Sequence, residues 1–248
     1  VARSGGVMGA GPSAVYLSVG CGRAAVRNSG PHRRSRPLSL FVYVQDPRMH
    51  HDRFDLILAP RHDRLSGRNV VSLIGSPNRI TPERLAEGRR AFRGAIDALP
   101  EPRIAALIGG DSKHHRVTPA VTAYLVERLA DLHRDGASLM ITVSRRTPDA
   151  LAAQLRRRFA DAERCLLYAG EGPNPYFAFL DAADWIFVTE DSTNMLTEAA
   201  STGKPVYRLP LEGRPGKFER LYGELETAGV VRPWLGRLEA WAPQPLQE

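Results

Sequence analysis

The sequence predicts an α/β protein built from two Rossmann-like, doubly wound halves. Short apolar runs rich in β-branched and aromatic residues alternate with segments of helical pattern, which is typical of βαβ units and a parallel sheet. These runs are apolar on both faces, as in strands that are buried between two layers of helices. The pattern restarts after the Pro-Glu-Pro segment at 100–102, which we interpret as a linker.

The first half, residues 1–100, is predicted to contain four strands and one helix. The helix is expected over 82–98, because Thr81 can cap it and Pro82 suits the first helical position. The apolar runs predict the strands at 14–20, 38–44, 54–60 and 69–75.

The second half, residues 101–235, is more regular and is predicted to contain five βα units. Strands are expected at 103–110, 138–145, 164–170, 185–190 and 204–210. Helices are expected at about 118–135, 148–159, 174–183 and 193–202, and a further one over 216–229 would be closed by Gly229. Residues 236–248 are assigned to a tail. A helix that crosses back to the first half would explain Trp234 and Trp241.

The charge pattern does not favour a nucleic-acid-binding protein. The net charge is +7 and the isoelectric point is near 9.8. Only three of the 34 basic residues are lysines, however, and acids lie among the arginines. The densest basic run, 27–36, lacks interleaved aromatic residues, which is typical of a solvated loop.

A cytoplasmic location is expected from three observations. No apolar run approaches the roughly 20 residues of a membrane-spanning helix. The first residues lack the charged, apolar and small order of a secretory signal. Cys21 and Cys165 lie far apart and neither belongs to a CxxC pair, so nothing indicates a disulfide framework or a zinc site.

Anion-compatible residues follow several strands of the second half, where open parallel sheets bind ligands. Gly109 and Gly110 allow a tight turn and a close backbone approach. The next strand ends in Ser144 and Arg145, and a guanidinium fork suits phosphate oxygens. The alternative, that Arg145 and Arg146 are ordinary solvated residues, stays open and is the simpler explanation for Arg146.

The fourth strand of this half is followed by a helix start that carries hydroxyl and amide side chains. Ser192, Thr193 and Asn194 lie where free N–H groups and the positive end of the helix dipole would hold a phosphate. Glu198, one turn further, could accept a hydrogen bond from a sugar hydroxyl. The simpler interpretation is a self-contained cap, in which Asp191 or Ser192 caps an amphipathic helix.

Four residues are candidates for general acid or base chemistry. Asp46, His62, Asp63 and Asp111 all follow predicted strands, but the sequence shows no partner geometry, and a structural role is the simpler explanation for each. The histidine pairs at 50–51 and 114–115 are adjacent residues rather than an i,i+4 pair, so no metal site is expected.

Eight motifs together resemble a known protein family over residues 13–234. In chain order they are GCGR (20–23), QDPR (45–48), FDLILAPRHD (54–63), GSPNRIT (75–81), IGGDSKHHRVT (108–118), TVSRRTP (142–148), GPNPYFAFLDAAD (172–184) and VTEDSTNMLTEAASTGKPV (188–206). They closely resemble the bacterial branch of the mitochondrial-fission "elongated mitochondria" family. That family is in turn similar to the GT-B glycosyltransferase superfamily, whose second half binds a nucleotide-sugar donor.

The resemblance implies a GT-B-like fold that carries a nucleoside-diphosphate sugar on its second half. The residues that match the donor-binding positions are Gly109, Gly110, Ser144, Arg145, Ser192, Thr193, Asn194 and Glu198. Family members usually open with a further strand and a Gly-rich loop, so the N-terminal half is expected to be truncated by one or two βα units. No residue matches an established GT-B catalytic base.

Three functions are compatible with these observations. The first is binding of a nucleoside-diphosphate sugar in a cleft between the halves and, in an active enzyme, transfer of the sugar, with no separate cofactor. The second is a non-catalytic adaptor that keeps the fold and binds a protein partner. The third is a nucleotide-sugar epimerase, for which His62, His114 and His115 could supply acid and base groups.

Overall fold

The chain divides into two compact units between Pro77 and Asn78. The computed structural model describes residues 6–8, 15–20 and 39–246. The sequence predicts the boundary near residue 100, after the helix expected over 82–98. In the structure this segment belongs to the second unit, because helix α1 (Pro82–Ala91) packs against helix α5 (Tyr176–Ala182).

The first unit is a five-stranded sheet in the order β1-β2-β3-β4-β5. Strands β2 to β5 are parallel, as predicted, whereas β1 pairs with β2 in the antiparallel direction. The two connections described in this unit contain the short 3-10 helices η1 and η2 in place of α-helices. The elements are β1 (Gly6–Met8), β2 (Val15–Gly20), β3 (Ser39–Val44), η1 (His51–Arg53), β4 (Leu56–Pro60), η2 (Arg61–Asp63) and β5 (Val70–Leu73).

A small aromatic and aliphatic core lies on one face of this sheet. Ile57 and Ala59 alternate along β4 and are fully buried. The rings of Tyr43 and Phe54 pack with their centroids 4.9 Å apart, and Leu65 covers the cluster from the following loop. The alternation places one side of β4 in this core, as the period of a β-strand requires.

The second unit contains a parallel six-stranded sheet in the order β13-β11-β10-β6-β8-β9. The chain begins in the central strand β6, adds β8 and β9 on one side, returns to β10 beside β6, and continues to β11 and β13. This reversal is a topological switch point, where open α/β sheets bind ligands at the carboxyl ends of the strands. The strands are β6 (Arg103–Ile108), β8 (Ser138–Val143), β9 (Cys165–Tyr168), β10 (Trp185–Thr189), β11 (Val206–Leu209) and β13 (Val231–Pro233).

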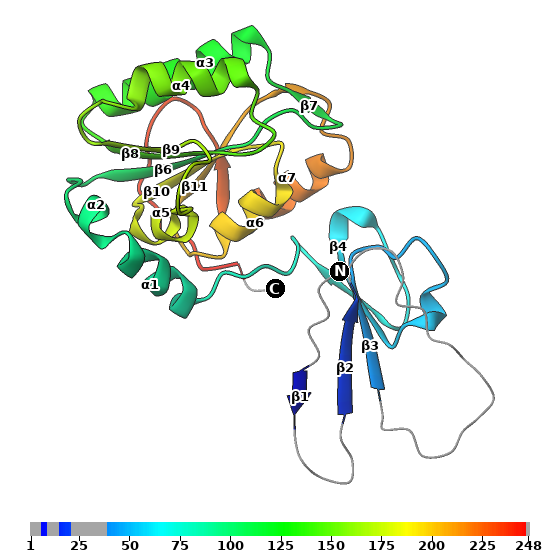
Figure 1. The fold of residues 1–248 in the computed structure, drawn as a ribbon. Helices are drawn as coiled ribbons and strands as arrows, with labels where there is room; N and C mark the ends of the chain where they lie inside the picture. The colour runs from blue at the N-terminus through cyan, green and yellow to red at the C-terminus, as the bar shows by residue number, and fades with distance from the viewer. Residues whose placement is uncertain (1–5, 9–14, 21–38, 247–248) are drawn as a thin grey trace. The chain divides into compact units, whose positions relative to one another are not determined.

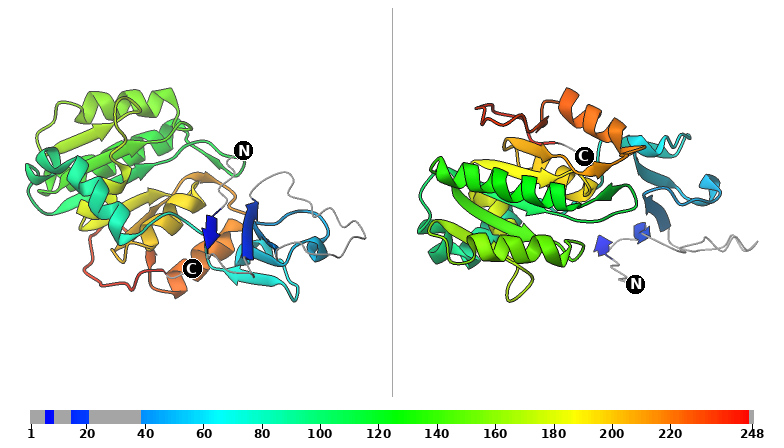
Figure 2. Two further views of the ribbon diagram at one scale, coloured as in Figure 1. Left: turned by 60° about the horizontal axis from the view of Figure 1, so that its bottom comes forward. Right: turned by 90° about the horizontal axis from the view of Figure 1, so that it is seen from above.

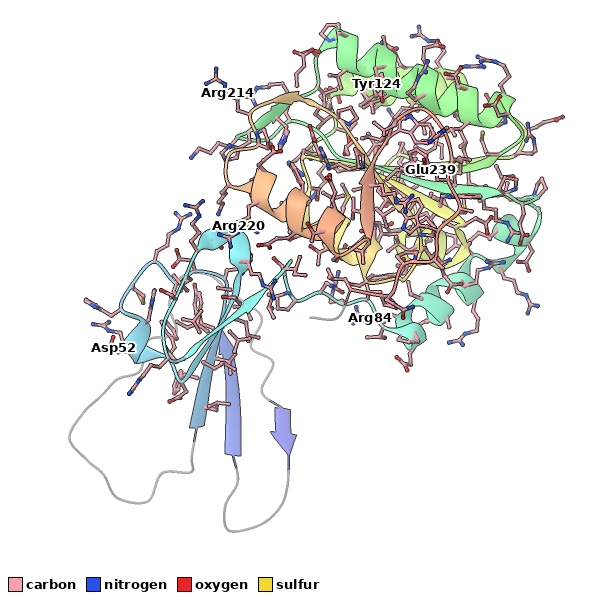
Figure 3. The ribbon with its side chains drawn as sticks, turned by 180° about the vertical axis from the view of Figure 1, so that it is seen from behind. Asp52, Arg84, Tyr124, Arg214, Arg220 and Glu239 are labelled. Atoms are coloured by element: carbon pink, nitrogen blue, oxygen red, sulfur yellow. The ribbon has the colours of Figure 1, made fainter. Side chains whose placement is uncertain are left out.

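Helices cover both faces of this sheet, so the predicted doubly wound arrangement is present in the second unit. Helices α3 (Pro119–Arg134) and α4 (Asp149–Phe159) lie side by side on one face (Figures 1 and 2). Helices α5, α6 (Thr193–Ala200) and α7 (Phe218–Thr227) lie on the other (Figure 1). Tyr124 on α3 and Arg84 on α1 mark these two sides of the sheet (Figure 3). None of the helices within the described ranges has the length and apolar character needed to span a membrane.

The helix predicted over 82–98 is interrupted at Phe92. Its backbone angles, φ −116° and ψ 17°, end α1 and let a second helix begin, α2 (Arg93–Asp97). Helix α1 has no buried residue, whereas Ile96 of α2 is 0% exposed. The interruption therefore reorients the chain so that the apolar side of α2 reaches the core.

Two further elements were not predicted from the sequence. Strands β7 (His115–Arg116) and β12 (Glu212–Gly213) pair in the antiparallel direction and form a short ribbon. Arg214, directly after β12, extends away from the body of the unit (Figure 3). Strands of two residues are too short to show a hydrophobic periodicity, so they cannot be predicted from the sequence pattern.

The expected helix crossing back to the first half is not present in the described residues. Residues 234–246 run without regular structure along the second unit. Trp234 is 8% exposed and packs against Phe187 and Tyr207, with ring centroids 4.9 Å away in both cases. Trp241 also contacts Tyr207. Both tryptophans therefore complete the core of the second unit.

A stability test follows from the packing of α1 on α5. A Cβ atom on Gly88 would lie 2.8 Å from the Phe177 Cβ and 2.9 Å from the Ala178 amide nitrogen. We expect Gly88→Ala to lower the free energy of unfolding by about 1–3 kcal/mol, because the two helices must move apart. Gly223→Ala on α7 is the matched control, since its Cβ would meet no atom within 4 Å. The control should be neutral or stabilise by up to about 1 kcal/mol, and equal effects in urea unfolding would contradict this packing account.

Candidate functional site

The candidate site lies at the carboxyl edge of the six-stranded sheet, where three neighbouring strands end. Gly109 and Gly110 follow β6, and Ser144 follows β8. Glu190 and Asp191 follow β10, which pairs with β6. The parallel sheet thus brings together residues that are up to 82 positions apart in the sequence, from 109 to 191.

Asp191 occupies the space beside the two glycines. Its side chain is 0% exposed, and Oδ2 accepts hydrogen bonds from the Gly110 amide at 3.0 Å and from the Arg146 guanidinium at 2.7 Å. A Cβ atom at position 109 would lie 2.2 Å from Asp191 Oδ1, and one at position 110 would lie 1.9 Å from the Arg146 carbonyl oxygen. The close approach that these glycines permit is therefore to the protein's own carboxylate and backbone.

The amide of Gly109 is also used internally. It donates to the Thr189 hydroxyl at 2.7 Å. On the other side, the Thr147 hydroxyl donates to the Gly109 carbonyl oxygen at 2.6 Å and accepts from the Ser144 amide at 2.9 Å. The Ser144 hydroxyl in turn accepts from the Arg146 amide at 3.1 Å. Gly109 and Ser144 thus shape the loops at this edge.

The two adjacent arginines after β8 have different surroundings. Arg146 is bound to Asp191, and it also donates to the Asp111 carbonyl oxygen at 3.3 Å. Arg146 is exposed, as the simpler interpretation expects, but its ion pair with the buried Asp191 also gives it a structural role. Arg145 is exposed, and its guanidinium has no hydrogen-bond or ion-pair partner in the described part of the chain. Of the two, Arg145 is the side chain that can reach a ligand without breaking a contact.

The start of α6 follows directly from Asp191. The Ser192 hydroxyl accepts from the Met195 amide at 3.3 Å, so Ser192 is the N-cap of the helix. This cap satisfies one of the free amides of the first turn, while the amides of Thr193 and Asn194 have no acceptor within the helix. Asn194 is exposed and Thr193 and Ser192 are half-buried. Two donors at the positive end of the helix dipole therefore remain open.

Glu198 is held in place by a tyrosine. The Tyr176 hydroxyl donates to Glu198 Oε2 at 2.7 Å. Burial, and secondly the Glu198 charge, hold the pKa of the Tyr176 phenol well above its usual value, so the phenol remains a donor. The sequence carries no signal for this pair, because the two residues lie on different helices. The local signal concerns only the start of α5, where the Asn174 side chain accepts a hydrogen bond from the Tyr176 amide at 3.0 Å.

A buried polar network lies behind Asp191 and fixes the preceding residue, Glu190. The Glu190 carboxylate accepts from the Leu211 amide at 2.8 Å and from the Arg208 guanidinium. The Tyr222 hydroxyl donates to the Glu190 carbonyl oxygen at 2.6 Å. His115, which is 1% exposed, places Nε2 4.0 Å from Glu190 Oε1. Burial lowers the pKa of His115 despite the opposing effect of the Glu190 charge.

The candidate acid and base residues are divided between the two units. Asp111 is exposed, and its Oδ1 accepts from the Val117 amide at 2.8 Å, which closes the turn before α3. Asp46, His62 and Asp63 belong to the first unit. There, His62 Nε2 lies 3.7 Å from Asp63 Oδ1.

Asp46 lines a surface hollow of the first unit. The hollow measures about 750 Å³ and is also lined by Arg48, Met49, His50, His51 and Leu65. Asp46 Oδ1 accepts from the Arg48 amide at 2.8 Å. Throughout the described ranges, no three His, Cys, Asp or Glu side chains are arranged to hold a metal ion.

Sequence comparisons place the whole chain among named relatives. The family model described as "Mitochondrial fission ELM1" matches residues 4–248. The "Mitochondrial fission protein ELM1" of Arabidopsis thaliana is 28% identical over 259 residues, covering 94% of this chain and 61% of that protein. "Uncharacterized protein RP120" of Rickettsia prowazekii (strain Madrid E) is 30% identical over 206 residues, covering 76% of this chain and 54% of that protein. The chain therefore spans less than two thirds of these relatives.

Solved structures that resemble part of the chain include an epimerase and a glycosyltransferase. UDP-GlcNAc 2-epimerase from Neisseria meningitidis bound to UDP-GlcNAc matches 72% of this chain and 49% of its own, with 14% identity and a TM-score of 0.48. WaaG, a glycosyltransferase involved in lipopolysaccharide biosynthesis, matches 85% of this chain and 51% of its own, with 18% identity and a TM-score of 0.40.

Neighbouring arginines provide a first test of the site's geometry. Arg146→Ala should lower the free energy of unfolding by about 3 kcal/mol, because it leaves the buried Asp191 carboxylate without its cationic partner. Arg145→Ala should change it by less than about 0.5 kcal/mol, since this side chain is exposed. Denaturant unfolding of both variants measures the difference, and equal stabilities would show that the ion pair with Asp191 does not support this edge.

The network around His115 predicts a pH dependence of stability. Its folded-state pKa is below the value of about 6.5 in an unfolded chain. Below about pH 6.5 the unfolded state therefore binds more protons than the folded state. The contribution of His115 to the free energy of unfolding is present above about pH 6.5 and is lost as the pH falls. The slope of this loss is at most about 1.4 kcal/mol per pH unit. Urea unfolding at several pH values should show a shallower loss in His115→Gln. A loss of the same steepness in both proteins would contradict the prediction.

Proposed function

The chain belongs to the mitochondrial fission ELM1 family, and we propose that its second unit binds a nucleoside-diphosphate sugar at the carboxyl edge of the six-stranded sheet. The observation that carries this proposal is the fixed Glu198. Tyr176 holds this carboxylate one turn behind the open N-terminus of α6, beside the switch point of the sheet. A carboxylate and an anion-binding helix start are the two recognition elements that a sugar and its diphosphate need.

The diphosphate is assigned to the start of α6 in this proposal. The open amides of Thr193 and Asn194 donate to its oxygens, and the helix dipole favours its negative charge. Arg145 adds a guanidinium that no protein group occupies in the described residues. Ser192 caps the helix, while Gly109, Gly110 and Ser144 shape the loops and do not contact the ligand through their amides.

The sugar or ribose is assigned to Glu198. Oε2 is already bound to Tyr176, so Oε1 is the atom offered to a ligand hydroxyl. The tyrosine prevents the carboxylate from rotating freely, which lowers the entropy lost on binding. This preorganisation distinguishes Glu198 from an ordinary exposed acid on a helix.

Binding is the part of this function that the second unit's own residues support. Transfer also needs a base for the acceptor hydroxyl, and the carboxylates that follow β6 and β10 are engaged: Asp111 with Val117, Glu190 with Leu211 and Arg208, and Asp191 with Arg146. The proposal includes sugar transfer only if the base comes from outside this edge. A cytoplasmic location would give the protein access to soluble nucleotide sugars.

Calorimetric titration with a panel of nucleoside diphosphates and their sugar derivatives tests the proposal. We expect Arg145→Ala and Glu198→Gln each to weaken binding by tenfold or more, because each removes a hydrogen bond to a charged group worth about 1.5–3 kcal/mol. Tyr176→Phe should weaken it less, since it only frees the carboxylate. Arg157→Ala, an exposed arginine of α4, is the control and should bind as the original chain does. Absence of binding across the panel would instead support an adaptor that keeps the fold without the ligand.

A further inference from the structure

We propose that the second unit carries another ligand site, for a phosphate group, in a hollow that we call the arginine hollow. The ligand is inorganic phosphate or a small phosphorylated molecule. The hollow measures about 410 Å³, within the size range of small-molecule sites, and lies between α1, α2 and α5. It is lined by Ala86, Arg89, Arg90, Arg93, Asp97 and Asp181.

The arginine hollow is at the amino edge of the sheet, opposite to the candidate nucleotide-sugar site. Asp181 lines the hollow, and its carbonyl oxygen accepts from Lys204, which also donates to the Ala183 carbonyl oxygen at 2.7 Å. Lys204 precedes β11 and Ala183 precedes β10, so both mark the beginning of strands. The six-residue strand β6 separates the two edges by roughly 20 Å. One small ligand cannot contact both sites.

Two arginines in this hollow keep unused donors. Asp97 is bound on both oxygens, by Arg89 Nη2 at 2.5 Å and by Arg93 Nε at 3.3 Å. This leaves the two terminal nitrogens of Arg93 without an acceptor among the described residues. Arg90 is exposed and has no hydrogen-bond or ion-pair partner there. Two guanidinium groups on one side of a hollow suit an oxyanion, since each can donate a pair of hydrogen bonds.

The charge around the arginine hollow also favours an anion. Three guanidinium groups and two carboxylates line it, which gives a net charge of +1 (3 − 2). Lys204 lies behind it, and burial lowers its pKa; the charges of Asp181 and Asp184 oppose this effect, while those of Arg89 and Arg103 add to it more weakly. The cations thus outnumber the acids on the lining. An oxyanion bound between Arg90 and Arg93 would lower the repulsion between these two guanidinium groups.

Titration with inorganic phosphate, followed by amide NMR shifts and by calorimetry, tests this inference. The expected result is saturable binding with shifts at Arg90, Arg93 and Gly94, and at least a tenfold weakening in the double variant Arg90→Ala/Arg93→Ala. The control Arg157→Ala/Arg158→Ala removes the same charge from α4 and should leave the phosphate affinity unchanged. Equal weakening in both double variants, or no saturable binding in the original chain, would overturn the proposal.

A second arm separates this site from the proposed nucleotide-sugar site. Arg145→Ala should keep the phosphate-induced shifts at Arg90 and Gly94 while weakening nucleoside diphosphates. Arg90→Ala/Arg93→Ala should do the reverse. If the phosphate-induced shifts at the arginine hollow disappear in Arg145→Ala, the hollow is not an independent site and the inference fails, whatever the outcome for the nucleotide.

Discussion

The carboxylate of Asp191 ties together the ends of three neighbouring strands, and the arrangement of the candidate site depends on this contact. The residue follows β10, accepts from the amide after β6, and pairs with Arg146 after β8. Because the Asp191 side chain is fully buried, its charge needs the hydrogen bonds from both Gly110 and Arg146. Asp191 and the Arg146 backbone can come this close to the chain at 109 and 110 because glycine has no Cβ atom. With the carboxylate fixed here, α6 begins at the next residues with its open amides at the sheet edge.

The sequence was sufficient to predict the helices and strands that are marked by a local hydrophobic pattern. Strands β6, β8, β9, β10 and β11 and helices such as α3 were predicted within a few residues, since their hydrophobic runs and caps are local signals. The short edge strand β13 was not predicted. The break at Phe92 and the ribbon of β7 and β12 depend on tertiary packing and had no such signal. Arg145 and Arg146 illustrate the same limit in the site, because two adjacent arginines look alike until Asp191, 45 residues beyond Arg146, binds one of them. The pairing of Tyr176 with Glu198 was missed for the same reason.

Family membership and the proposed ligand rest on different parts of the chain. The match to the mitochondrial fission ELM1 family extends over residues 4–248, whereas the residues that we propose to bind a nucleoside-diphosphate sugar all lie in the second unit. Within that unit, the structure separates residues that support the edge, such as Asp191 and Arg146, from residues that keep unused polar atoms, such as Arg145 and Glu198. The proposed function uses the second group and requires the first group to stay in place.

The position of the diphosphate is the central claim, and amide NMR shift mapping with the tightest-binding nucleoside diphosphate tests it most directly. The account predicts that the largest shifts fall on the amides of Thr193 and Asn194, with smaller shifts at Arg145, while the Gly110 amide keeps its hydrogen bond to Asp191 and moves little. Largest shifts at Gly109 and Gly110, or no shift at the start of α6, would contradict it.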